Sequence, residues 1–219
     1  MHDYQREFIE FAIHNDVLRF GEFKLKSGRI SPYFFNSGLF NSGASIARVG
    51  RYYAETIMRA ELAFDMLFGP AYKGIPLAVA TAVAIAEYHD RDIPYAFNRK
   101  EAKDHGEGGI IVGAALQGRT LIIDDVISAG TSVSESIQLI RSVGAQPAGV
   151  VVALDRQECS HGSLSAIQEV EQRHGIPVLS IITLDQIMNC MASMRGMDDI
   201  LVRIQTYRNQ YGVKMTPNK

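Results

Sequence analysis

The stretch TLIIDDVISAGTSVSES, residues 120–136, joins an apolar run to two adjacent carboxylates and then to small hydroxyl residues and a glycine. An apolar run with no polar side chain after Thr120 is typical of a buried strand. Asp124 and Asp125 would then stand at the carboxyl end of that strand, where the ligand crevice of an open α/β sheet lies. The segment therefore predicts a strand, a binding loop and a helix in direct succession.

The rest of the chain continues this alternation. From Ser45 onward, apolar runs bounded by glycine or proline are separated by helical stretches, which is typical of buried parallel strands in an α/β sheet. The expected strands are MLFG, PYAFN, GIIVGA, TLIID, GVVVALD and VLSIITL. The expected helices cover residues 45–63, 75–88, 133–142, 163–174, 184–194 and 198–210. We predict an α/β protein with a mainly parallel central sheet flanked by helices.

The N-terminal 40 residues have a different texture. Aromatic side chains recur at helical spacing after Asp3, a candidate N-cap, so residues 3–15 are expected to form an amphipathic helix. The short β-type runs FGEFKL and PYFFN, separated by KSGRIS, predict a hairpin outside the main sheet. We therefore expect an N-terminal helix and β hood over 1–40 and an α/β core with C-terminal helices over 41–219, together forming a single compact domain.

Composition narrows the class of protein. The 219 residues carry a formal net charge of -2 and are 47% hydrophobic and 21% charged, which argues against general binding to nucleic-acid backbones or anionic membranes. Cys159 and Cys190 stand in no metal-ligand spacing, so both are expected to be reduced and not to form a disulfide or a zinc site. The longest apolar stretch, GIPLAVATAVAIA, is shorter than the roughly 20 residues of a membrane span. We expect a cytoplasmic protein.

The residues after the acidic pair suit a phosphate. They are small, they carry hydroxyls, and they open a helix whose first N–H groups attract anions. Carboxylates so close to a phosphate would repel it, so their partners should be sugar hydroxyls or a Mg2+ ion reached through them. A sugar phosphate has both features. The alternative is an Asp N-cap in an ordinary turn between strand and helix.

The segment resembles the nucleotide-sugar signature of the type I phosphoribosyltransferases. FKLKSGRISPYFFN, FGPAYKGIPLA, FNRKEAKDHGEGG, LIIDDVISAGTS and ALDRQE stand in the order and spacing of the orotate phosphoribosyltransferases, so the resemblance covers nearly the entire chain. It implies the type I phosphoribosyltransferase fold with its N-terminal hood. It also implies transfer of the 5-phosphoribosyl group from 5-phospho-α-D-ribose 1-diphosphate (PRPP) to N1 of orotate, giving orotidine 5'-monophosphate and diphosphate in UMP biosynthesis.

Two further motifs fit a diphosphate substrate. FGPAYKGIPLA places loop N–H groups and the Lys73 ammonium at the crevice edge. The segment FNRKEAKDHGEGG combines cations with glycines, a composition that is most often found in solvated loops. Beside a diphosphate, the same composition suits a mobile lid that stabilises the leaving group. By resemblance, the residues that bind PRPP are Lys26, Tyr72, Lys73, Arg99, Lys100, Lys103, His105, Asp124, Asp125, Val126, Ile127, Ser128, Ala129, Gly130, Thr131 and Ser132. Among them, the catalytic roles fall to Lys26, Lys103, His105, Asp124 and Asp125.

The resemblance also assigns a base site. Phe34 and Phe35 would frame the flat orotate ring, Ser128 would contact it, and Arg156 would grip its carboxylate in a planar, charge-assisted contact. One of the two phenylalanines should still face the core, because successive side chains of a strand point in opposite directions. The family signature commonly has Thr at position 128 and a small apolar residue at position 132, where this chain has Ser128 and Ser132.

Mg2+ and a homodimer follow from the same resemblance. The ion would be held mainly through PRPP with no direct protein ligand, and the 99–109 loop would reach the active site of the adjacent subunit. Three alternatives remain open: a phosphoribosyltransferase for another base, a regulator that senses PRPP, and a phosphoacceptor receiver domain. The regulator should carry an added basic module, which is not visible here. A receiver domain has its acids near its own N-terminus and is about half as long as this chain.

Overall fold

A computed structural model describes the chain except for residues 26, 104–108, 129, 160–161 and 214–219. Within this described part, the central sheet contains β3 (Met66–Gly69), β4 (Tyr95–Lys103), β5 (Gly109–Gly113), β6 (Arg119–Ile123), β7 (Gln146–Asp155) and β8 (Val178–Thr183). The strand order is β5-β4-β3-β6-β7-β8, and neighbouring strands are parallel except β4 and β5. The predicted mainly parallel sheet is confirmed.

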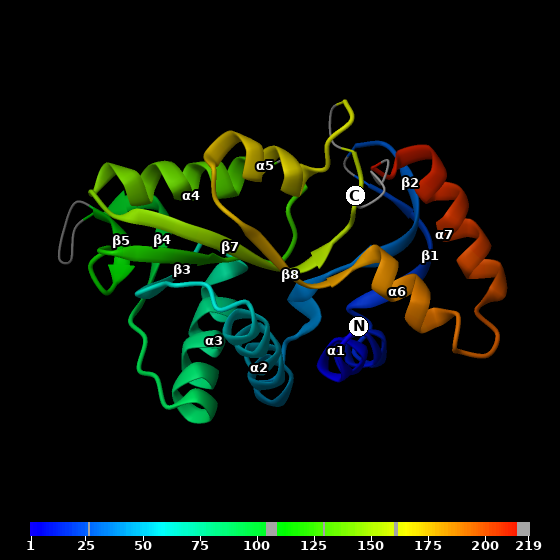
Figure 1. Ribbon diagram of the computed structural model, residues 1–219, viewed down its shortest axis with the longest axis horizontal. Coiled ribbons are helices and arrows are strands. Elements are labelled where there is room, and N and C mark those ends of the chain that lie inside the picture. The colour runs from blue at the N-terminus through cyan, green and yellow to red at the C-terminus, as the bar shows by residue number, and fades with distance from the viewer. Residues whose placement is uncertain (26, 104–108, 129, 160–161, 214–219) are drawn as a thin grey trace.

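Helices cover both faces of this sheet (Figure 1). The helices of the described residues are α1 (Asp3–His14), α2 (Gly43–Arg59), α3 (Gly74–His89), α4 (Thr131–Ser142), α5 (Ala166–His174), α6 (Leu184–Met191) and α7 (Asp198–Tyr211). In Figure 1, α4 and α5 lie on one side of the sheet and α2 and α3 on the other, while α1, α6 and α7 lie beyond β8. The chain is therefore a three-layer α/β structure with an extension at one end.

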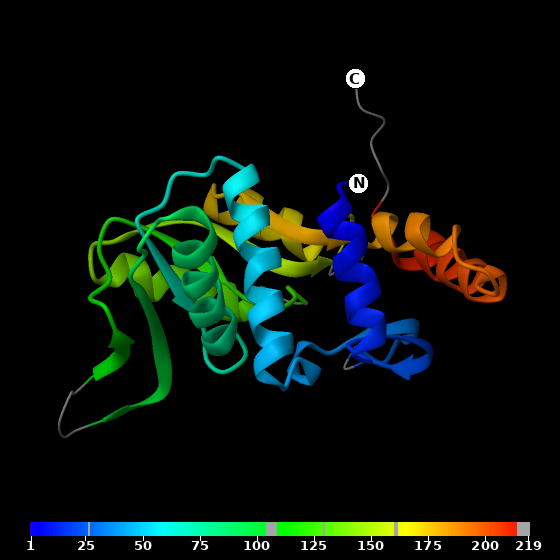
Figure 2. The ribbon, with the colours of Figure 1, turned by 90° about the horizontal axis from the view of Figure 1, so that it is seen from below.

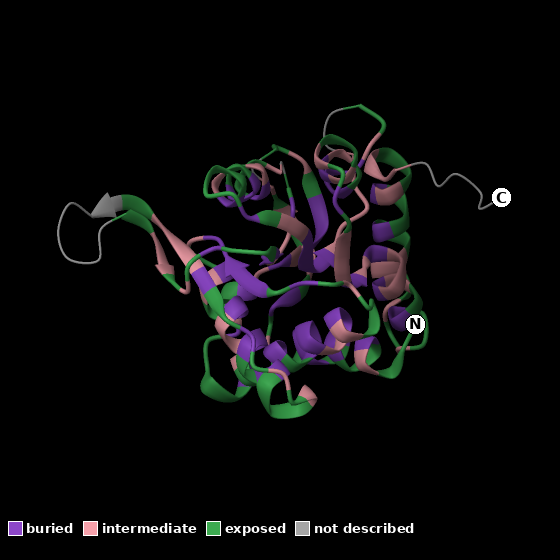
Figure 3. Cartoon of the chain, turned by 60° about the vertical axis from the view of Figure 1, so that its left-hand side comes forward, coloured by how far each residue is buried: buried purple, intermediate pink, exposed green. Residues whose placement is uncertain are grey.

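Alternation along the strands divides the core in two. Met66 and Phe68 of β3 belong to the cluster formed with α4 and α5, whereas Leu67 belongs to the cluster formed with α2 and α3. Ile122 of β6 faces the first cluster, and Ile123 faces the second. Because successive side chains point to opposite faces, strands buried on both sides must be apolar throughout. Buried segments accordingly run through the middle of the molecule in Figure 3.

The N-terminal hairpin is also confirmed. Strands β1 (Leu18–Lys24) and β2 (Ile30–Phe35) pair antiparallel in a separate two-stranded sheet, and the short helix η1 (Ser37–Leu39) leads on to α2. Helix α1 lies beside α2 (Figure 2), and the rings of Phe8 and Tyr52 meet edge to face at 5.2 Å. The N-terminal segment thus shares a core with the rest of the chain. The division at residue 40 stays a prediction.

The run GIIVGA differs from the expectation of a buried parallel strand. It forms β5, which is antiparallel to β4 and is partly or fully exposed along its length. A parallel partner needs a crossover of a dozen or more residues, and only five residues separate β4 from β5. Together the two strands form an arm that projects from the body of the protein (Figures 2 and 3).

Some helix ends also differ from the sequence prediction. Asp3 is the first residue of α1 and not its N-cap; the cap is His2, whose backbone N–H donates to the Gln5 side chain at 2.9 Å. Helix α5 begins at Ala166 and not at residue 163, because the Ser165 hydroxyl accepts from the Gln168 N–H and fixes the start. The predicted helices 45–63, 133–142 and 184–194 are Gly43–Arg59, Thr131–Ser142 and Leu184–Met191.

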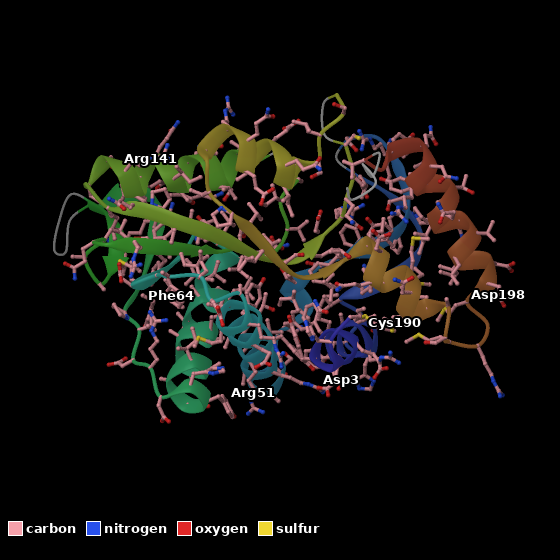
Figure 4. The ribbon with its side chains drawn as sticks, in the orientation of Figure 1. Asp3, Arg51, Phe64, Arg141, Cys190 and Asp198 are labelled. Atoms are coloured by element: carbon pink, nitrogen blue, oxygen red, sulfur yellow. The ribbon has the colours of Figure 1, made fainter. Side chains whose placement is uncertain are left out.

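Two expectations drawn from composition can be compared with the structure. Both cysteines are free thiols; Cys159 is partly buried, and Cys190 is buried on α6 near α1 (Figure 4). The expectation that they form no disulfide with each other is confirmed. In the described residues we find no helix that combines the length and hydrophobicity needed to cross a membrane.

Candidate active site

The acidic pair lies at the carboxyl end of β6, as predicted. The Asp124 N–H donates to the carbonyl of Val151 at 3.0 Å, which continues the pairing of β6 with β7 by one residue. The Asp124 side chain is buried, and its Oδ1 accepts from the Asp125 N–H at 2.9 Å. From α2, the Tyr53 hydroxyl donates to the Asp124 carbonyl at 2.7 Å. The main chain at this point is therefore held from two sides.

Burial makes the Asp124 carboxyl a weaker acid than an ordinary aspartate. It raises the pKa of this group to about 7, and the neighbouring charge of Asp125 adds to the effect. The hydrogen bond from the Asp125 N–H, the Lys73 ammonium and the Ser132 hydroxyl act in the opposite direction and are weaker. Near neutral pH, both the protonated and the ionised form of Asp124 are therefore populated, and the side chain can either donate or accept a hydrogen bond.

Asp125 brings three distant segments together. Its Oδ2 accepts from the Ser37 hydroxyl at 2.6 Å and from the Lys73 ammonium at 2.8 Å. Ser37 comes from η1, and Lys73 comes from the loop between β3 and α3. Its Oδ1 accepts from the Val126 N–H at 2.9 Å. The predicted diphosphate loop and the predicted sugar-binding acids are thus in direct contact.

The loop after the pair opens α4 as expected. Gly130 is the N-cap and has a left-handed backbone with φ of 67°, a conformation that favours glycine. It provides no capping side chain, so the first N–H groups of α4 are left for another partner. Ser128, Thr131 and Ser132 are exposed beside them. This end of α4 has the donors and hydroxyls that a phosphate monoester needs.

Other predicted members of this loop have different surroundings. Ile127 is buried in the α4–α5 core, and Val126 packs against the opposite core, so contacts of either with a ligand would use the backbone. Ala129 lies outside the described residues. The two apolar side chains anchor the loop on both sides of the sheet.

The loop between β3 and α3 is held close to the strands. A Cβ on Gly74 would lie 2.7 Å from the carbonyl oxygen of Ile123, so only glycine permits this approach. The Ala71 N–H donates to the Asn98 side chain at 2.8 Å, and the peptide bond between Ala71 and Tyr72 is cis. The Tyr72 side chain is 69% exposed. The loop thus lies between β3 and α3 with Tyr72 exposed to solvent.

The predicted lid corresponds to the β4–β5 arm. Lys100 of β4 places its ammonium 4.9 Å from the centre of the Tyr72 ring, and Arg99 is partly buried. The arm therefore begins next to the candidate diphosphate loop. The side chain of Lys103 and the whole of His105 lie outside the described residues, so their predicted roles are not tested.

The predicted base-site residues occupy β2 and the end of β7. Phe35 faces the core, whereas Phe34 points to the other side and stacks on Phe23 at 5.5 Å, so the expected alternation of the pair is confirmed. Arg156 follows β7, and its guanidinium contacts Glu158 at 2.7 Å. Lys26 lies outside the described residues.

Comparisons with known proteins agree with this geometry. The model of the phosphoribosyl transferase domain family matches residues 36–171. The chain is 60% identical over 213 residues to the orotate phosphoribosyltransferase of Thioalkalivibrio sulfidiphilus, which covers 97% of this chain and 100% of that protein. The chain belongs to the orotate phosphoribosyltransferase family. The enzyme of Pseudomonas aeruginosa has the same identity and coverage.

Solved structures of this family agree in fold. The orotate phosphoribosyltransferase of Francisella tularensis has a TM-score of 0.86 and 44% identity, and the match covers 94% of this chain and 99% of that one. The UMP synthase of Leishmania donovani has a TM-score of 0.74 and 25% identity, and the match covers 94% of this chain but 42% of that longer one. The predicted type I phosphoribosyltransferase fold is confirmed.

Four residues that fix the candidate site were not predicted from the sequence. Ser37, Tyr53, Asn98 and Glu158 each donate or accept a hydrogen bond that fixes a predicted site residue or its loop. Glu158 lies two residues after Arg156 in the motif ALDRQE, so its contact with Arg156 could have been predicted from this spacing. The other three give no local pattern that marks them.

Proposed function

We propose that this chain transfers the 5-phosphoribosyl group of PRPP to N1 of orotate and releases orotidine 5'-monophosphate and diphosphate. The observation that carries the proposal is the contact of Lys73 with Asp125 beside the open N-terminus of α4. These three elements supply a cation for the diphosphate, carboxylates for ribose hydroxyls and N–H donors for the 5'-phosphate. The identity of the base rests on the relatives: the chain is 60% identical to an orotate phosphoribosyltransferase, which supports orotate as the acceptor.

The reaction depends on positioning of the two substrates and not on covalent catalysis by the protein. In a transfer where bond breaking runs ahead of bond making, the sugar becomes oxocarbenium-like, and diphosphate leaves with increasing negative charge. Asp124 and Asp125 hold the ribose hydroxyls and favour positive charge on the ring. Lys73 leaves Asp125 when the sugar hydroxyls take its place, and then contacts the diphosphate. No side-chain nucleophile is required.

The carboxylates of the acidic pair are compatible with a Mg2+ ion that is bound mainly through the substrate. Among the described residues, no group of three or more His, Cys, Asp or Glu side chains could hold a metal ion. Asp124 and Asp125 would hold the ribose hydroxyls of the substrate that carries the ion, and would not be its direct ligands. When bound, the ion would neutralise diphosphate charge.

The β4–β5 arm and an apolar groove support a homodimer. The arm projects from the body (Figure 3), and its strand β4 ends at Lys103, so we expect the arm to reach a neighbouring active site. On the outer side of α2 and α3 a groove of about 420 Å³ is lined mainly by apolar side chains, with Val83 and Tyr88 each 51% exposed. Arg51 of α2 stacks on Tyr88 at this groove (Figure 4). A second copy of the chain would cover this surface.

The function is tested by incubating the protein with PRPP, Mg2+ and orotate and following the loss of orotate absorbance. Adenine, hypoxanthine and uracil in place of orotate distinguish the base. Orotate alone should be consumed, and Asp125→Asn should slow its loss while the far-UV circular dichroism spectrum stays unchanged. Consumption of another base, or of none, would overturn the proposal. Sedimentation equilibrium should give twice the mass of 24.2 kDa.

A further inference from the structure

The segment after β7 contains a buried ion pair between Arg156 and Glu158. Arg156 donates to Oε1 of Glu158 through Nε at 3.0 Å and through Nη2 at 2.7 Å. The two side chains are only 14% and 11% exposed. Nη2 also donates to the Ser31 hydroxyl at 3.3 Å, and the guanidinium lies over the Tyr33 ring at 4.4 Å. Arg156 therefore has one defined orientation.

Glu158 is itself fixed from two elements. The Tyr33 hydroxyl of β2 donates to its Oε1 at 2.8 Å, and the Tyr207 hydroxyl of α7 donates to its Oε2 at 3.1 Å. Burial raises the pKa of Tyr33 well above its usual value and raises the pKa of Tyr207 as well, so both phenols remain protonated donors. Arg29 adds a cation 3.9 Å from Oε2. The carboxylate is therefore held from both ends.

The backbone of this segment is attached to the end of α7. The Cys159 N–H donates to the Tyr211 carbonyl at 2.8 Å, and the Val213 N–H donates to the Gln157 carbonyl at 2.9 Å. The residues on either side of Glu158 are thus held by the C-terminal helix. At the other end of the segment, the Ala153 N–H donates to the Asp125 carbonyl at 2.8 Å. A continuous path of contacts joins α7 to the acidic pair.

Glu158 occupies one edge of the Arg156 guanidinium. Both hydrogen bonds to Glu158 use the edge formed by Nε and Nη2, so Nη1 lies on the side facing away from that carboxylate. Burying a guanidinium without a counter-ion would cost free energy of folding. A counter-ion bound at the edge that contains Nη1 would compete with a ligand for that edge. In our proposal Glu158 compensates the charge through one edge of the guanidinium, and the incoming carboxylate would bind Nη1.

We infer that Glu158 is a positioning residue that, anchored by Tyr33 and Tyr207, sets the plane of the Arg156 guanidinium for the carboxylate of the pyrimidine substrate. The inference rests on the proposed function, because Arg156 is the residue proposed to grip that carboxylate. It assigns a role in base recognition to α7, which lies on the far side of β2 from the sugar-binding loops (Figure 1). Glu158 acts through Arg156 and does not touch the substrate.

The test compares three variants of the full chain. Glu158→Gln keeps the shape of the side chain and removes its charge. Tyr207→Phe keeps the ring and removes the hydroxyl that anchors Oε2. Tyr211→Phe is the matched control, since it removes a hydroxyl from the same helix and the same aromatic cluster without affecting Glu158. For each variant, KM is measured separately for orotate and for PRPP, together with kcat and the temperature of thermal unfolding.

We expect Glu158→Gln to raise KM for orotate about tenfold, which corresponds to about 1.4 kcal/mol. KM for PRPP should stay within about twofold, because Asp124 and Asp125 are unchanged. Tyr207→Phe should raise KM for orotate about threefold, as expected for the loss of one hydrogen bond to a charged group. Tyr211→Phe should leave both KM values unchanged.

Several outcomes would overturn the inference. Equal increases in both KM values would show a general structural effect, and unchanged KM for orotate in Glu158→Gln would remove the residue from base recognition. If Glu158→Gln does not fold, Tyr207→Phe decides, and an unchanged KM for orotate in that variant overturns the role. These results differ from failure of the proposed function, in which the unaltered protein itself would not consume orotate.

Discussion

Replacing Asp124 with Asn should stabilise the protein at high pH while weakening its activity. Asn keeps the oxygen that accepts from the Asp125 N–H and removes the charge that burial disfavours. In the unfolded chain, the pKa of this carboxyl returns to its ordinary value of 3.8, whereas in the folded chain it is about 7. The folded state therefore binds the proton more tightly. It loses stability as pH rises from about 4, and the loss is complete above about 7.

The size of the effect follows from the two pKa values. Their difference of about 3 corresponds to on the order of 4 kcal/mol, since one pKa unit is worth about 1.4 kcal/mol. Between pH 5 and pH 8 the unaltered protein should lose about 3 kcal/mol relative to Asp124→Asn, because part of the loss has already occurred at pH 5. Activity should change in the opposite direction, since the ionised carboxylate is the better acceptor for ribose hydroxyls.

Urea unfolding at pH 5 and pH 8 measures this difference directly. The free energy of unfolding of Asp124→Asn is compared with that of the unaltered protein at each pH, and kcat/KM for PRPP is measured in parallel. A gap in unfolding free energy that stays constant between the two pH values would refute the raised pKa. Full activity in the variant would refute the proposed contact with the sugar.

Three further changes test other parts of the site. Gly74→Ala should cost about 1–3 kcal/mol in urea unfolding, because the new Cβ would lie 2.7 Å from the Ile123 carbonyl oxygen; unchanged stability would contradict that close approach. Ser37→Ala removes the donor 2.6 Å from Asp125 and should lower kcat/KM for PRPP about tenfold, which corresponds to about 1.4 kcal/mol; a value equal to that of the unaltered protein would leave the hydroxyl without a role. Lys103→Ala should lower kcat by more than it raises KM, since its contact strengthens as diphosphate charge develops; an unchanged kcat would exclude the lysine from the mechanism.

The sequence predicted those parts of the site that depend on local chemistry. The acidic pair, the helix that follows it and the loop before α3 each follow from neighbouring residues, because an apolar strand, a turn and a helix leave short-range patterns. The hairpin of β1 and β2 follows for the same reason. The mainly parallel sheet follows from the alternation of such patterns along the chain.

Contacts between distant segments were not predictable in this way. Ser37 reaches Asp125 across 88 positions, and Tyr53 reaches Asp124 across 71. Neither position carries a pattern of its own, since a serine after a strand and a tyrosine in a helix are both common. The exposed antiparallel β5 has the apolar composition of a buried strand, so its position at the sheet edge was missed. The contact of Lys73 with Asp125 depends on how two loops meet in space.

The hydrogen bond from Tyr53 to the Asp124 carbonyl has a consequence for cooperativity. Tyr53 belongs to α2, and the outer side of the same helix lines the groove proposed to receive a second copy of the chain. Gly50 lets α2 pack so closely on α3 that a Cβ at this position would collide with the Ala80 backbone. The proposed partner at the groove and the proposed sugar phosphate at the acidic pair would therefore both contact one closely packed helix pair, through which we expect the two binding events to be coupled. Such linkage is reciprocal: the factor by which PRPP would change the affinity of the subunits for each other equals the factor by which a bound partner would change the affinity for PRPP.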